Sequence, residues 1–156
     1  MALRQEIDEE VPGWVRLGLG VVLAIPQLAI GFWAVIAPEN WYSRFPGFDP
    51  RLIAADPPFN EHLATDTGAG FLATGVALVV AALLGRRSGA LVALAGYFAF
   101  AIPHAVFHSA HSSPGLDGSE DVFNAVLLWA NVALAVLFTW GAWPRRSAAA
   151  AASSSP

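Results

Sequence analysis

The chain has 156 residues, of which 56% are hydrophobic and only 13% are charged, and this is too apolar for an ordinary soluble domain. The net charge is -4, and the sequence contains no cluster of basic residues that could bind a nucleic acid. Because the chain contains no cysteine, disulfides and metal sites built on thiolates are excluded.

Four apolar stretches are long enough to cross a bilayer as helices, since a hydrocarbon core of about 30 Å needs about 20 helical residues. They cover residues 14–37, 63–84, 89–107 and 122–143. We therefore predict an all-α fold, an antiparallel bundle of four transmembrane helices within residues 14–143. An acidic segment at 1–13 precedes this membrane domain, and a disordered tail rich in alanine and serine at 144–156 follows it.

The distribution of arginine predicts the orientation of the bundle, because the chain has no lysine. In a four-span arrangement, one side carries Arg4, Arg16, Arg86, Arg87, Arg145 and Arg146. The other side carries Arg44 and Arg51. The positive-inside rule then predicts a multi-pass protein of the cell membrane with both termini in the cytoplasm. The loops at 38–60 and 112–120 are expected on the outer side.

Small residues predict which helix faces pack together, since membrane helices approach closely where side chains are small. One such face on the first span holds Gly20, Ala24, Gln27, Gly31 and Ala34. The expected faces on the second and third spans hold Asp66, Gly70, Ala73, Ala77 and Ala81, and Gly89, Ala93 and Gly96. Gln27 is expected to form a hydrogen bond between helices.

The four histidines gather at the outer end of the predicted bundle. His62 and Asp66 are four residues apart on one helix, and His104, His108 and His111 follow at positions i, i+4 and i+7 of the next. Ionisable groups inside membrane spans are costly and usually face the interior or a cavity. These side chains are therefore candidates for a functional site.

A transition metal is the first hypothesis for this site, because imidazole and carboxylate suit zinc, iron, copper, nickel or manganese. His104 and His108 would be two ligands, with His62 or Asp66 as the third. The outer members would be His111, Glu61 and Asp121. Such a site could carry redox or hydrolytic chemistry.

Three other hypotheses remain open. A haem could be held by two histidines on facing helices. His104 and Asp66 could instead form an acid and base pair that acts on a lipid-soluble small molecule entering from the lipid bilayer. Finally, the protein could be a non-enzymatic membrane subunit or lipid-binding module in which the polar cluster only stabilises the bundle. The sequence is therefore compatible with an enzyme and with a protein that has no catalytic activity.

Three segments of the chain resemble a group of bacterial four-helix membrane proteins that has no assigned activity. They are the segment Phe59-Asn60-Glu61-His62-Leu63 with Asp66-Thr67-Gly68-Ala69, the segment Pro103-His104 with Phe107-His108 and His111, and the aromatic loop Trp41-Tyr42-Ser43-Arg44-Phe45-Pro46-Gly47. More distantly, the layout is similar to that of the DoxX-like membrane proteins. The resemblance implies a four-helix membrane fold and no particular chemistry.

Overall fold

The computed structural model describes residues 9–144, and within this range the chain is helical, with four helices long and apolar enough to cross a membrane. The first span, Gly13–Ile36, consists of α2 (Gly13–Leu17), the π-helical η1 (Gly18–Leu23) and α3 (Ala24–Ile36). The other three are α5 (Glu61–Leu84), α6 (Arg87–Ala110) and α7 (Gly118–Ala142). The predicted four-helix membrane fold is confirmed, and the protein is a multi-pass membrane protein.

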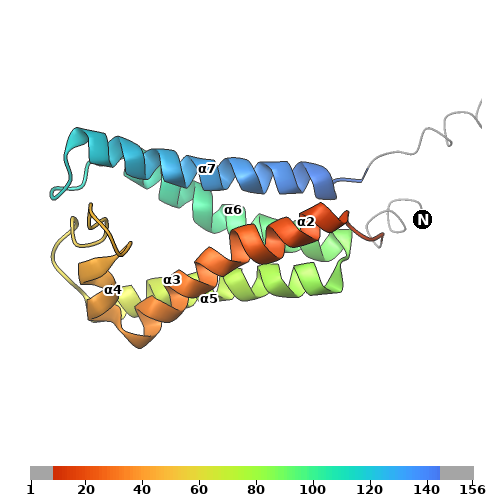
Figure 1. Cartoon of the computed structure of the whole chain (residues 1–156), viewed down its shortest axis with the longest axis horizontal. Helices are drawn as coiled ribbons and strands as arrows, with labels where there is room; N and C mark the ends of the chain where they lie inside the picture. Colours follow the sequence, from red (N-terminus) through yellow and green to blue (C-terminus); the bar gives the residue numbers. More distant parts are fainter. Residues whose placement is uncertain (1–8, 145–156) are drawn as a thin grey trace, which may run out of the picture.

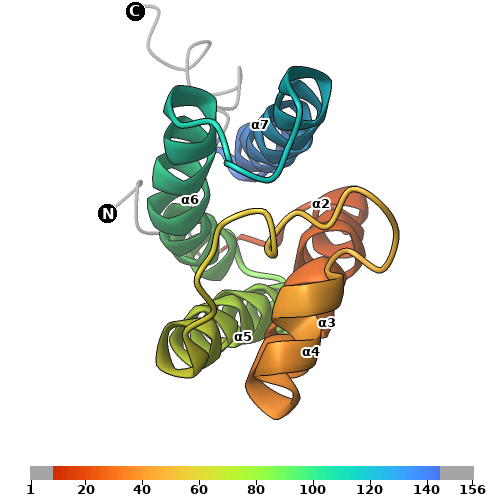
Figure 2. The same cartoon turned by 90° about the vertical axis from the view of Figure 1, so that its left-hand side faces the viewer.

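The spans run as an antiparallel bundle, with the described ends of the chain at one end and the longer loops at the other (Figure 1). A short helix that sequence analysis did not predict, α4 (Pro38–Arg44), follows the first span at the loop end. From α4 the chain runs across this end of the bundle before it enters α5 (Figure 2). We call residues 45–60 the crossing loop. Arg4, Arg145 and Arg146, most of the acidic segment at 1–13 and nearly all of the tail at 144–156 lie outside the described residues.

Glycines allow α3 and α5 to pack closely against each other. A Cβ atom at Gly31 would lie 2.8 Å from the backbone oxygen of Gly68, and one at Gly68 would lie 2.8 Å from the Cβ atom of Ala34. The predicted face of the first span is confirmed at Ala24, Gln27, Gly31 and Ala34, which are all buried, while Gly20 is half-buried. Thr74 Oγ1 donates a hydrogen bond to Gln27 Oε1 at 3.1 Å, as expected for a polar residue on this face.

The predicted packing face of α5 is wrong except at Ala81, which is buried as expected. Asp66, Ala73 and Ala77 are exposed, and a side chain at Gly70 would meet nothing within 4 Å. The buried small residues of this helix are Ala64, Gly68, Gly75 and Ala81. The helix is therefore rotated relative to the prediction, and this rotation turns Asp66 away from the core.

Side-chain caps fix where α5 and α7 begin. Asn60 Oδ1 accepts a hydrogen bond from the amide of Leu63 at 3.1 Å. Asp117 forms a capping box with Glu120 at the start of α7. Hydrogen bonding, first from the hydroxyl of Ser119 and then from the backbone, lowers the pKa of Asp117. The cap therefore contributes stability above the ordinary carboxyl pKa, and this contribution is lost as the pH falls through the lowered value.

Two arginines bind the carbonyl ends of membrane helices at the other end of the bundle. Arg16 Nε donates to the backbone oxygen of Ala82 at 3.0 Å, near the end of α5. Arg87 Nη1 donates to the backbone oxygen of Trp143 at 2.9 Å, and its Nη2 lies 3.4 Å from a carboxylate oxygen of Glu9. Both arginines place positive charge where the helix dipole is negative.

Replacing Arg87 with glutamine should lower the free energy of unfolding by about 1–3 kcal/mol, because the end of α7 and Glu9 lose a partner that is largely buried. The matched control is Arg44→Gln, since the exposed Arg44 side chain has no hydrogen bond or ion pair with any residue from 9 to 144. Chemical denaturation in detergent, followed by circular dichroism, would compare the two. Equal loss of stability would show that Arg87 does not hold α7.

Candidate functional site

The centre of the bundle contains a partly enclosed cavity of about 210 Å³ near the loop end. All four spans line it, and α4 and the crossing loop contribute Trp41, Phe45, Leu52 and Ile53. Most of the lining is apolar. The polar residues in the wall are Gln27, Thr67, Tyr97, His104, His108, Asn124 and Asn131.

Several polar groups in this wall have no hydrogen-bond partner among residues 9–144. Trp41 is 4% exposed, and its indole Nε1 is buried and has no hydrogen-bond partner in this range. Asn124 is 8% exposed, and its side-chain amide also makes no hydrogen bond to a described residue. A buried donor without a partner costs about 1–3 kcal/mol, so such groups indicate a site that something else completes.

Two histidines stand next to each other in the cavity wall. The rings of His104 and His108 meet edge to face with centroids 4.8 Å apart, one turn apart on α6. His104 also stacks on Phe100 at 5.6 Å, and Phe100 contacts Phe71 of α5 at 4.8 Å. Aromatic contacts therefore hold the His104 ring in place, while its nitrogens form no hydrogen bond to the described part of the chain. The nitrogens remain available to a ligand.

The crossing loop is fixed over the cavity by contacts with the α6–α7 turn. The buried Ser113 donates twice: its hydroxyl donates to Asp56 Oδ2 at 3.0 Å, and its amide donates to Asp121 Oδ1 at 3.2 Å. The amide of Gly115 donates to the backbone oxygen of Ala55 at 3.0 Å. Asp121 is therefore a structural residue that helps to hold the cover of the cavity.

Replacing Gly115 with alanine should loosen this cover, because a Cβ atom at Gly115 would lie 2.7 Å from the Cα atom of Ala55. We expect amide hydrogen exchange within residues 45–60 to become about tenfold faster, which corresponds to about 1.4 kcal/mol of local stability. The control is Gly118→Ala, where an added Cβ meets nothing within 4 Å. Unchanged exchange in Gly115→Ala would show that this contact does not hold the loop.

The structure separates the residues that were predicted to share one site. His62 Nε2 and Asp66 Oδ2 are 3.3 Å apart, but their side chains are 81% and 62% exposed and do not line the cavity. His111 stacks on Phe107 at 4.5 Å, outside the cavity. Glu61 lines a separate surface pocket beside Glu39.

Within residues 9–144, no group of three or more histidine, aspartate or glutamate side chains is arranged to hold a metal ion. Of the seven predicted site residues, only His104 and His108 line the cavity. The transition metal and the haem stay predictions from the sequence.

Sequence analysis did not identify the tryptophan and the tyrosine of the cavity as site residues. Trp41 belongs to the aromatic loop at 41–47, and such aromatic residues are typical of a membrane interface. Tyr97 lies within an apolar stretch that gives no signal of its own. Asn124 carried a signal, because an amide one turn inside a membrane helix is costly unless it is paired. Comparison with protein-family models, with curated proteins and with solved structures gave no match, so the likeness to DoxX-like proteins stays a resemblance.

Proposed function

We propose that this multi-pass membrane protein binds a neutral, lipid-soluble small molecule in the central cavity. The observation that carries the proposal is that Trp41, whose buried Nε1 has no hydrogen-bond partner among residues 9–144, belongs to the cavity wall. A ligand that accepts a hydrogen bond from this group would remove a desolvation cost that the empty protein bears. Asn124, Tyr97 and His104 offer further hydrogen-bonding groups to the same ligand.

The lining defines the chemical class of the ligand. No arginine, aspartate or glutamate is part of the cavity wall, so an uncharged molecule fits better than an ion. The indole N–H is a donor only, which requires an acceptor such as a carbonyl, ether or hydroxyl oxygen. The apolar wall, including Phe71 and Leu52, suits a hydrocarbon or ring body.

The size of the cavity favours a molecule that is only partly enclosed. A volume of about 210 Å³ is below the roughly 300–1,000 Å³ of sites that enclose drug-sized ligands. Pro26 of α3 and Leu127 of α7 both line the cavity and are both exposed on the bundle surface. We infer that the polar end of the ligand lies inside and that an apolar tail extends into the bilayer.

His104 and His108 place two imidazole side chains in the cavity wall, and imidazole can act as a general acid or base toward a bound molecule. Asp66 does not line this cavity, so any acid and base chemistry here would use the two histidines and not the predicted His104 and Asp66 pair. Binding is the function that the geometry supports, and turnover would be a further step. The placement of Arg16, Arg86 and Arg87 at the end opposite the cavity supports the proposal that the cavity lies on the outer side.

The test is to identify what copurifies with the protein. Protein isolated in mild detergent, without a nickel column, would be extracted with organic solvent, and the extract would be analysed by mass spectrometry. We expect a neutral molecule at about one equivalent per chain in the wild type and in the control Ala99→Leu, whose side chain is exposed. Ala101→Leu should reduce it about tenfold, because Ala101 is buried in the cavity wall and the larger side chain occupies the ligand's space.

Equal amounts of the molecule in Ala101→Leu and Ala99→Leu would contradict the proposal, as would its absence from all three proteins. Elemental analysis of the same samples separates the metal hypothesis from this one. About one equivalent of zinc, iron, copper, nickel or manganese, lost in both His104→Ala and His108→Ala, would instead favour a metal site.

A further inference from the structure

A second pocket, different in character from the cavity, lies at the loop end of the first span. It has a volume of about 560 Å³ and is mainly polar. Its lining residues are Trp33, Asn40, Ser43, Arg44, Gly47 and Arg51. Trp33 belongs to the last turn of α3, so this pocket lies at the edge of the membrane-spanning region.

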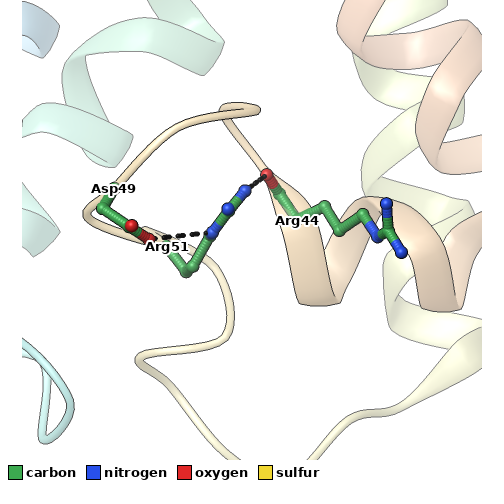
Figure 3. Close-up of polar contacts among 3 residues, drawn as sticks. All are labelled: Arg44, Asp49 and Arg51. Atoms are coloured by element: carbon green, nitrogen blue, oxygen red, sulfur yellow. Dashed lines mark hydrogen bonds and ion pairs between the residues drawn. The ribbon is translucent and has the colours of Figure 1, made fainter.

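One of the two arginines in this pocket is held rigidly. Arg51 Nε binds Asp49 Oδ1 at 3.0 Å, and Arg51 Nη1 donates to the backbone oxygen of Arg44 at 2.8 Å (Figure 3). Gly47, whose φ of +107° favours glycine, donates its amide to the same oxygen. The Asp49 carboxylate compensates the charge of Arg51, and Arg51 Nη2 forms no hydrogen bond to the described residues.

The other arginine has no such compensation. The Arg44 side chain extends away from Asp49 and Arg51 (Figure 3). It is exposed and has no ion pair or hydrogen bond with any residue in the range 9–144. Arg44 therefore leaves one uncompensated positive charge in a pocket of this otherwise acidic protein.

The neutral side chains of the pocket are arranged to donate as well. Trp33 Nε1 donates to Asn40 Oδ1 at 2.9 Å, which orients the amide and leaves Asn40 Nδ2 without an acceptor among the described residues. Glu39, the only carboxylate of α4, lines a neighbouring pocket with Glu61, and that pocket shares Asn40 with this one. The free groups of this pocket are thus donors and one positive charge, which is the chemistry that recognises a phosphate.

We propose that this pocket binds the phosphate of a membrane lipid headgroup, with Arg44 as the main contact and with Asn40, one turn earlier on α4, as an additional donor. Its place at the end of the first span is the depth at which lipid phosphates lie. The proposal is independent of the central cavity, because no arginine lines that cavity. It assigns the pocket to an anionic lipid rather than to a soluble anion.

The experiment is native mass spectrometry of the full chain reconstituted with phosphatidylglycerol and then released from the lipid. We expect the wild type to retain one phosphatidylglycerol molecule. In Arg44→Gln the retained fraction should fall about tenfold, because a charge-assisted contact is lost. In Arg86→Gln, which removes the same charge at the opposite end of the bundle, it should stay within about twofold.

Two further results would overturn the assignment. Equal lipid retention in the wild type and Arg44→Gln would show that Arg44 does not hold a headgroup. A separate experiment titrates inorganic phosphate into the protein in detergent without added lipid and follows tryptophan fluorescence. Saturable binding of inorganic phosphate that Arg44→Gln abolishes, together with no lipid retention, would assign the pocket to a free anion and not to a lipid. Circular dichroism of Arg44→Gln confirms that its fold is intact.

Discussion

Replacing Gly68 with leucine is expected to lower the free energy of unfolding by about 2–3 kcal/mol. A Cβ atom at this position would lie 2.8 Å from Ala34 Cβ and 2.9 Å from a methyl carbon of Val35, so even alanine would force α3 and α5 apart. In a membrane no hydrophobic effect replaces the contacts that this separation removes. Denaturation in mixed detergent and sodium dodecyl sulfate, followed by circular dichroism, measures the loss.

Gly70→Leu is the matched control on the same helix. An added Cβ at Gly70 meets nothing within 4 Å, so we expect the free energy of unfolding to change by less than about 0.5 kcal/mol. The pair also tests which face of α5 packs against α3. A larger loss in Gly70→Leu than in Gly68→Leu would restore the packing face expected from the sequence and contradict the structure.

The four spans could be predicted from the sequence because bilayer thickness sets a length that 20 apolar residues satisfy. The packing face of α3 could be predicted as well, since its small residues are interrupted by large ones such as Ile25 and Phe32, which are exposed. The face of α5 could not. Gly70 lies on the opposite side of this helix from Gly68 and Gly75, so small size alone does not identify the side that faces α3.

Only the part of the candidate site that lies on a single helix could be predicted from the sequence. His104 and His108 share one face of α6, and helical periodicity alone is enough to place them together. The contribution of Trp41 depends on α4 and on the crossing loop, which is fixed by contacts between residues far apart in the sequence. The hydrogen bond between Gly115 and Ala55 is one of them, and no local pattern predicts it.

Replacing Trp41 with phenylalanine should reduce the amount of copurifying ligand about tenfold while it leaves the ligand-free protein almost as stable as before. The ligand loses the hydrogen bond from Nε1. The ligand-free protein loses an unpartnered buried donor, and the relief of about 1–3 kcal/mol offsets the packing that is lost with the smaller ring. Mass spectrometry of solvent extracts measures the ligand, and denaturation of the extracted, refolded protein measures stability.

Trp33→Phe is the matched control because the same atom has a partner there. Trp33 Nε1 donates to Asn40 at 2.9 Å, so its removal should lower the free energy of unfolding by about 0.5–1.5 kcal/mol. Trp33 does not line the central cavity, and ligand content should therefore stay at the wild-type level. The proposed hydrogen bond from Trp41 to the ligand requires that Trp41→Phe lowers ligand content but not stability, and that Trp33→Phe lowers stability but not ligand content. If Trp41→Phe lowered stability and left ligand content unchanged, the buried indole N–H would have no part in binding.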